Sequence, residues 1–309
     1  NILGLLVNLD NKNAFSYSWR VRSFTNAHGN SDNFSQLIFD NYSPTSTINT
    51  QVKNLSLQQH SYADHSFSYA RVLMNGKRRF FKAGVTLKVL NGINASYLYS
   101  SNADLTFNTN NTVNLNQTNF EYGHAQNSNG LSNRSLSVGG DLGFVYEFRP
   151  EKNTFKYEMN GNKNKVRHDL NKYKYKIGAS LLNIGRLKYA KDTNSYDFES
   201  NNTSVTTNTL FSSLGAQNIL NTNSINSSVL PQTTKSTGNS STFKVALPTE
   251  LSLQADYHLK NNYYVAFTTN IPIWFPNDAN KSHSTFIASL TPRYEGFFKV
   301  KINSYFPYF

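Results

Sequence analysis

The clearest pattern in this sequence is an alternation of apolar and polar residues, strongest between residues 243 and 275. Successive side chains of a β-strand point to opposite faces, so the pattern predicts strands with one apolar and one polar face. A short turn at 260–262 separates two such runs, 243–259 and 263–275. In the first run we expect Leu247, Leu251, Leu253 and Ala255 on the apolar face, and Lys244, Glu250, Gln254, Asp256 and His258 on the polar face.

The same alternation recurs along the chain and predicts twelve strands. These cover residues 2–9, 14–24, 62–74, 79–90, 93–100, 105–115, 135–148, 173–190, 243–259, 263–275, 284–294 and 297–306. The dipeptides Asn75-Gly76 and Asn91-Gly92 are typical of tight hairpin turns, and Glu295-Gly296 joins the last two strands. Residues 25–61 and 191–242 read as long polar connections, with possible short helices at 34–39 and 209–220.

The length of these runs indicates the fold class. Strands in ordinary domains are about five or six residues long, whereas a strand that crosses a bilayer needs about ten. Alternating runs of that length with aromatic ends are typical of membrane-spanning barrels. We therefore predict an all-β fold, an antiparallel transmembrane β-barrel located in the outer membrane.

Composition agrees with a barrel. The chain has 309 residues, 22 Phe, 19 Tyr and no Cys, and its mean hydropathy is −0.53. No run approaches the ~18 consecutive apolar residues of a transmembrane helix, which excludes a helical membrane protein. A barrel escapes detection by hydropathy because its lumen residues dilute those that face lipid.

The connections predict which side each strand end lies on. Outer-membrane barrels keep short turns in the periplasm and long loops outside, so 25–61, 116–134 and 191–242 are assigned to the outside. The basic connection 149–172 is the exception on the opposite side. On this assignment both chain ends lie outside, which predicts a single barrel domain over 1–309 that is incomplete at both ends. Twelve strands are then visible out of about fourteen. Phe309 stands in the polar phase and indicates an accidental end, although a true terminus stays open.

Charge adds candidate lumen residues. The net charge is +12, concentrated between residues 149 and 176 and on polar strand positions. No nucleic-acid-binding motif accompanies it, so a cationic lumen or a solvated loop explains it better. The predicted lumen-lining residues are Arg20, Arg22, Lys82, Lys88, Asp141, Glu147, Lys244, Glu250, Asp256 and His258. Pro248 and Pro272 lack the donor for strand pairing and predict a local break or bulge.

Four segments resemble a family of Bacteroidota outer-membrane proteins that is similar in barrel design to the FadL-like and PorV/PorP-type proteins. They are KAGVTLKVLNG at 82–92, SVGGDLGFVYEF at 137–148, YKIGASLLNIGRLKYA at 175–190 and TPRYEGFFKVKI at 291–302. The resemblance implies a barrel of about fourteen strands, sometimes joined to periplasmic domains. It transfers no catalytic residues.

Two classes of function remain. The histidines are scattered, and none has the spacing of a metal site or a catalytic triad, so we expect neither an enzyme nor a cofactor. The first class is a structural or accessory subunit of an envelope complex, with outer-membrane lipid and other envelope proteins as partners. The alternative is a FadL-like uptake channel for hydrophobic or small solutes. An open bore would favour the channel, and a plugged bore the subunit.

Overall fold

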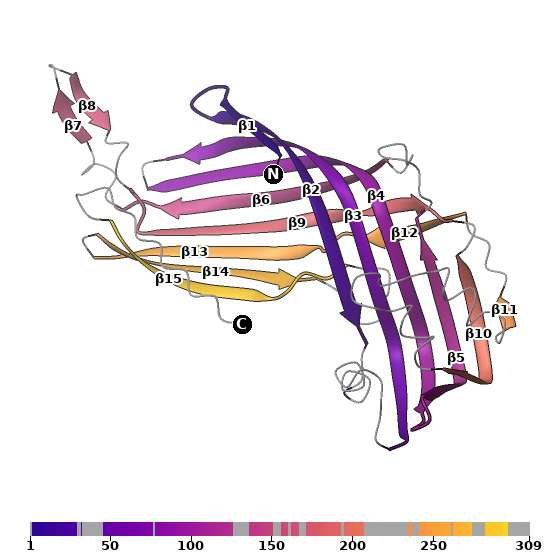
Figure 1. Cartoon of the computed structure of the whole chain (residues 1–309). Coiled ribbons are helices and arrows are strands. Elements are labelled where there is room, and N and C mark those ends of the chain that lie inside the picture. Colours follow the sequence, from indigo (N-terminus) through magenta and orange to yellow (C-terminus); the bar gives the residue numbers. More distant parts are fainter. Residues whose placement is uncertain are drawn as a thin grey trace.

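The computed structural model describes residues 2–29, 32, 46–76, 78–125, 136–150, 156–159, 162–166, 171–192, 195–206, 234–236, 241–260, 262–273 and 282–295. Within these residues the fold is built from β-strands (Figure 1). The strands are β1 (Leu3–Asn8), β2 (Asn13–His28), β3 (Ile48–Asn75), β4 (Arg79–Phe107), β5 (Thr112–His124), β6 (Leu136–Phe148), β7 (Lys156–Met159), β8 (Asn162–Val166), β9 (Tyr175–Ala190), β10 (Tyr196–Thr206), β11 (Thr234–Ser236), β12 (Thr242–Ala246), β13 (Glu250–Lys260), β14 (Tyr263–Pro272) and β15 (Ile287–Tyr294). No helix in the described residues is long and apolar enough to cross a membrane.

Thirteen of these strands form one antiparallel sheet, which confirms the predicted all-β antiparallel class. Its main path is β1-β2-β3-β4-β6-β9-β13-β14-β15. Three strands, β5, β10 and β11, continue from β4 beside this path, and β12 pairs with β9. A separate hairpin, β7-β8, lies within the basic segment that the sequence predicts as a loop.

The sheet is rolled. The Arg22 side chain on β2 donates a hydrogen bond of 3.2 Å to Asn183 on β9, although three strands lie between them. Neighbouring strands are about 4.8 Å apart, so a flat sheet would hold these two strands about 19 Å apart. We call the face that carries Arg22 and Asn183 the inner face and the opposite one the outer face. Figure 1 shows the curvature, with β13–β15 curling below β6 and β9.

The outer face of the main path carries large apolar side chains in contact with solvent. Leu87, Leu142 and Leu290 are 55%, 53% and 64% exposed, on three different strands. Their neighbours in sequence, such as Thr86 and Asp141, belong to the inner face. The predicted alternation is therefore present in the structure, with the apolar residues outside.

Two predicted connections are wrong because β3 and β4 are much longer than expected. They have 28 and 29 residues. Residues 48–61, predicted as part of a loop, pair with 94–107 of β4. The predicted turn at Asn91-Gly92 does not form: both residues stay paired with β3, and Asn91 also pairs with β6. A register shift between Ser61 and Tyr62, opposite this dipeptide, takes up the irregularity instead.

Two further predictions change at this end of the sheet. The predicted strand 105–115 is a hairpin, in which β4 ends at Phe107 and β5 begins at Thr112. Asn111, with φ 60°, makes the left-handed turn between them. The polar segment 191–242 contains β10, which pairs along β5. These strands and the far ends of β3 and β4 form an extension beyond the main path (Figure 1).

The predicted run 243–259 is broken between β12 and β13. Leu247, Pro248 and Thr249 leave the ladder there, at one of the two prolines where the sequence predicts a break. The break reverses the phase: Val245 and Leu247 are buried on the inner side, and Lys244 is exposed on the outer face opposite Lys188. The prediction that Leu247 faces outward and Lys244 lines the lumen is therefore wrong.

The remaining turns are confirmed where they are described. The hairpins β1-β2, β3-β4 and β13-β14 form at the predicted places. The Gly76 amide donates to the Arg79 carbonyl at 2.8 Å, closing the β3-β4 turn. The segments 34–39, 209–220 and 297–306 lie outside the described residues.

Candidate functional site: the inner face of the sheet

A network of ion pairs occupies the middle of the inner face. Arg20 on β2 donates to Asp64 on β3 at 2.9 Å, and Arg22 lies 3.6 Å from the same carboxylate. On the next strands, the Lys88 ammonium lies 2.6 Å from Asp141. Asp64 and Lys88 are almost fully buried, at 1% and 2% exposure. Buried charges of this kind persist in proteins when they are paired and hydrogen-bonded, as both are.

Asn183 connects the two halves of this network. Its side-chain oxygen accepts hydrogen bonds from Lys88 at 2.9 Å and from Arg22 at 3.2 Å. Its backbone amide donates to Asp141 at 2.7 Å. Asn183 has a φ of 55°, a left-handed conformation that asparagine adopts more readily than most residues, and it stands where the register between β6 and β9 shifts. The irregularity thus aims one amide side chain at charges from β2 and β4.

A second charged cluster lies nearer the short turns. The Asp256 carboxylate on β13 accepts hydrogen bonds from Tyr173 at 2.8 Å and from Arg293 at 3.0 Å, and Lys176 lies 3.8 Å from it. Arg293 also stacks over the Tyr264 ring, 4.8 Å from its centroid. Separately, Arg149 donates to Glu147 at 2.8 Å. His258 stacks on Tyr264 with ring centroids 4.5 Å apart.

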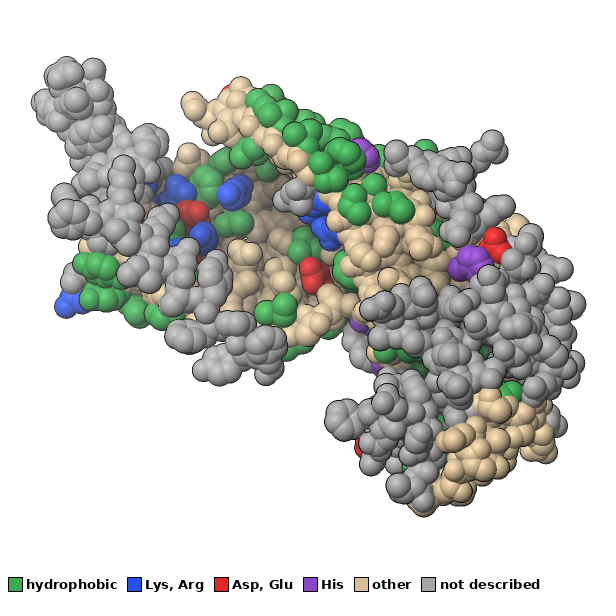
Figure 2. Space-filling model, in the orientation of Figure 1, with side chains coloured by type: hydrophobic (Ala, Val, Ile, Leu, Met, Phe, Trp, Pro, Cys, Tyr) green, Lys and Arg blue, Asp and Glu red, His purple; other side chains and the backbone are tan. Residues whose placement is uncertain are grey.

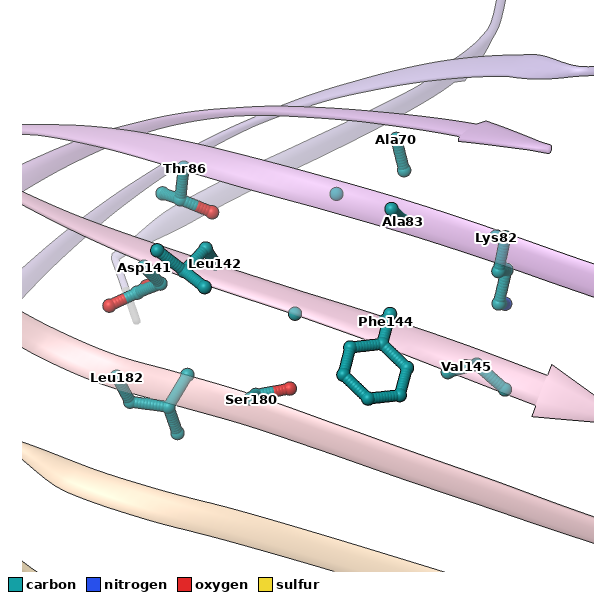
Figure 3. Close-up of a pocket in the computed structure, with 12 residues that line it drawn as sticks. Ala70, Lys82, Ala83, Thr86, Asp141, Leu142, Phe144, Val145, Ser180 and Leu182 are labelled. Atoms are coloured by element: carbon teal, nitrogen blue, oxygen red, sulfur yellow. The ribbon is translucent and has the colours of Figure 1, made fainter. Parts of the chain in front are cut away.

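Between the two clusters the inner face holds a shallow recess of about 280 Å³ (Figure 3). A row of small residues crosses it in register: Ala70, Gly84, Gly143 and Ser180 on four successive strands. A Cβ on Gly143 would lie 2.4 Å from the Ser180 hydroxyl, so close packing of the rolled sheet explains the glycine. Lys82 borders the recess and is exposed.

Buried apolar side chains close the inner face beyond the ion-pair network. The cluster comprises Tyr62, Leu90, Ala95, Ala125, Leu187, Tyr189, Val245 and Leu247, with Phe24 and Phe243 packed against it. A second buried cluster fills the extension, centred on Leu105, Phe107, Val113 and Leu115. Figure 2 shows charged side chains inside the hollow of the rolled sheet.

His60 and Ser282 fix a connection across this closed end. The His60 Nε2 atom lies 2.6 Å from the Ser282 hydroxyl, and both residues are 1% exposed. Next to it, Asn26 on β2 exchanges hydrogen bonds with the backbone of His283, at 2.9 and 3.2 Å. Ser282 also donates its amide to Ala246 at 3.1 Å. The segment that leads into β15 therefore contacts β2, β3 and the end of β12, crossing the inner side of the sheet.

Most of the predicted lumen residues share the inner face. Arg20, Arg22, Lys88 and Asp141 meet in the network, and Asp256 organises the second cluster. The others on this face, Lys82, Glu147, Glu250 and His258, lie outside the network. Lys244 lies on the outer face instead, as described above.

Three central residues were missed by the sequence analysis: Asp64, Asn183 and Arg293. Asp64 could have been found, because it stands in the polar phase of its strand. Asn183 could not, because its role depends on a shift of register.

The arrangement offers no evident chemistry. Within the described residues no group of three His, Cys, Asp or Glu side chains could hold a metal ion. His60 and Ser282 are in contact but have no access to solvent. The inner face instead carries paired charges beside packed apolar residues.

Comparison with known proteins adds one finding. The model of DUF5723, a family of unknown function, matches residues 1–306. The chain belongs to this family. No curated protein and no solved structure matches it.

Proposed function

We propose that this DUF5723 protein forms the wall of an outer-membrane β-barrel with an occluded lumen, and serves as a non-enzymatic structural or accessory subunit of an envelope complex. The observation that carries the proposal is the contrast between the two faces of the rolled sheet. Large apolar side chains are exposed outside, and paired charges are buried inside. Lipid is the environment in which such an outer face is stable.

The edges of the sheet support closure into a barrel. Antiparallel pairing along the nine-strand path makes β1 and β15 run in the same direction, and within the described residues each edge has a single partner. In a bilayer the unpaired backbone groups at such edges are costly. Closure by antiparallel pairing therefore requires an odd number of additional strands. A barrel of about fourteen strands, as the resemblance implies, would need five.

Occlusion favours the subunit over the channel. An ion-pair network reaches from β2 to β9. The apolar cluster that includes Tyr62, Leu90 and Leu187 lies beyond the network, on the side of the long connections. A solute would have to displace both. The recess beside Lys82 is the feature that favours a FadL-like uptake channel, because it is open space on the inner face. It ends at the network, so we keep the channel as the second candidate.

Folding into lipid tests the barrel. Leu142→Arg places a charge at the centre of β6 on the outer face, whereas Gln254→Arg adds the same charge to the inner face of β13. Near the bilayer midplane an outward Arg costs about 2–4 kcal/mol. We expect urea-dependent folding into liposomes to be weakened by Leu142→Arg and unchanged by Gln254→Arg. Equal folding of both variants would refute a membrane-embedded outer face.

Conductance then separates the two functions. The full chain, reconstituted into planar bilayers, should show no solute-permeable conductance if the lumen is occluded. Lys88→Met with Asp141→Asn replaces both partners of one ion pair and leaves no unpaired charge buried, and this variant is expected to stay closed because the apolar cluster remains. A steady conductance of the unmodified protein would favour the channel.

A further inference from the structure

Three cations form a cluster on the outer face where β9 meets β12. Lys188 and Lys244 are directly paired across the two strands, and Arg186 lies two residues before Lys188 on the same face. All three side chains are exposed. In the part of the chain that the structure describes, none of them has an ion pair with an acidic residue.

This arrangement is unfavourable in the protein alone. Directly opposed residues of an antiparallel pair hold their Cβ atoms about 5 Å apart, and like charges in that position repel. Arg186 adds a third positive charge within about 7 Å along the strand. The cluster would be stabilised by an anion that all three side chains can reach. Phosphate fits best, because Arg and Lys both bind it through charge-assisted hydrogen bonds.

The neighbouring strand shows what the anion is attached to. The register between Gly139 and Gly185, continued along both strands, places Val138 beside Arg186 and Leu136 beside Lys188. The Lys188 amide donates to Ser137 at 3.2 Å, which keeps the strands together there. Leu136 and Val138 are 73% and 65% exposed on the outer face. Cations therefore adjoin the end of the apolar outer face, as a ligand with acyl chains and a phosphorylated head would require.

The bulge on β9 creates this geometry. The register shift between Gly140 and Leu142 turns Ile184, Arg186 and Lys188 outward, and it turns Leu187 and Tyr189 into the buried apolar cluster. The break at Leu247–Thr249 turns Lys244 outward in the same way. Two separate irregularities thus bring three cations to one spot on the outer face, on the side of the long connections.

We propose that Arg186, Lys188 and Lys244 bind a phosphate of a phosphorylated glycolipid in the outer leaflet, with its acyl chains lying along Leu136 and Val138. The proposal rests on the membrane orientation in the proposed function. The bound lipid neutralises the repulsion between Lys188 and Lys244 and fixes the depth at which the barrel sits. This surface is an interaction site for lipid, separate from the inner face.

The test uses the purified full chain in detergent micelles. The probes are a deep-rough lipopolysaccharide with two phosphates on its lipid moiety, the same glycolipid after enzymatic dephosphorylation, and phosphatidylglycerol. Native mass spectrometry measures the bound lipid, and thermal unfolding measures the rise in Tm that it causes. The variants are Lys188→Gln with Lys244→Gln, and Lys188→Arg with Lys244→Arg. Lys53→Gln is the matched control, because it removes an exposed cation of the extension.

We expect the unmodified chain and the Arg variant to retain the bisphosphorylated glycolipid. The Gln variant should bind it roughly tenfold more weakly, the loss expected for broken charge-assisted contacts. Without lipid, the Gln variant should melt no lower than the unmodified chain, because a repulsion has been removed. Lys53→Gln should behave as the unmodified chain.

Equal binding by the Gln variant, or equal binding of the dephosphorylated glycolipid, would overturn the site. Equal retention of phosphatidylglycerol would overturn the glycolipid as its ligand. The Leu142→Arg experiment is independent of all three cations. Failure there would therefore be distinguishable from failure of the lipid site.

Discussion

At the scale of single residues, buried charge dominates the inner face. Lys88 is nearly without solvent contact, yet two oxygens, from Asp141 and Asn183, lie within 2.9 Å of its ammonium group. Removing one member of such a pair is expected to be far more harmful than replacing both, since the remaining charge would stay buried. We expect the network to favour one register of the rolled sheet, because Lys88, Asp141 and Asn183 come from three different strands.

His60 is the residue for which we predict a dependence on pH. The exposed apolar side chains of β3 begin at Phe67 and continue toward the β3-β4 turn. His60 lies seven residues before Phe67, on the side of the extension. Burial lowers its pKa to about 4, against an ordinary value of 6.5. The unfolded chain therefore takes up the proton more readily. His60 therefore leaves the free energy of unfolding unchanged above pH 6.5. As the pH falls toward 4, protonation of the unfolded chain lowers that free energy, by about 2 kcal/mol at pH 5.

Thermal unfolding at pH 7.5 and at pH 5 measures this effect. The unmodified chain should lose Tm at the lower pH, and His60→Gln should lose less. His65→Gln is the control, because His65 lies on the same strand but is only partly buried. An unchanged pH dependence in His60→Gln would show that the Ser282 contact does not require a neutral His60.

At the scale of elements, the sequence predicts strands well and their ends poorly. Alternation located β1, β2, β6, β9 and β14 within a few residues, because one face of each is apolar. It failed where β3 and β4 continue past Asn91-Gly92, since the neighbouring strands hold this dipeptide in the ladder. Local turn preference is weaker than pairing on two sides. Likewise, alternation places Lys244 on the inner face. The break at Pro248 moves it to the outer face, and nothing about Lys244 itself indicates this change.

Gly185 allows a test of the bulge on β9. Its φ is +144°, and an added Cβ would lie 2.9 Å from the Gly139 Cα atom. Gly185→Ala should therefore destabilise the fold by about 1–3 kcal/mol. Gly4→Ala, on β1, would meet no atom within 4 Å and should change stability by less than about 0.5 kcal/mol. Urea midpoints of the two variants in detergent decide the point, and equal midpoints would show that β9 relaxes around the bulge.

At the scale of the whole molecule, two packing regimes share one sheet. The main path exposes its apolar side chains and buries paired charges, whereas the extension buries an apolar cluster of its own, as a water-exposed domain does. The strands β3 and β4 each pass through both regimes as one continuous strand, with a register shift between Ser61 and Tyr62. A lipid boundary between the two would explain why one strand pair follows two opposite rules of burial.

That boundary predicts which side of the membrane each end of the molecule occupies. Thr109 lies in the exposed turn at the tip of the extension, and Lys12 lies in the exposed β1-β2 turn at the other end. The chain has no Cys, so single cysteines at these positions are unambiguous labels. On intact cells, a membrane-impermeant maleimide should label Thr109→Cys and leave Lys12→Cys unlabelled until the outer membrane is opened. Labelling of Lys12→Cys alone would reverse the orientation and move the cationic cluster to the periplasmic leaflet. Immediate labelling of both would mean that no membrane separates the two ends.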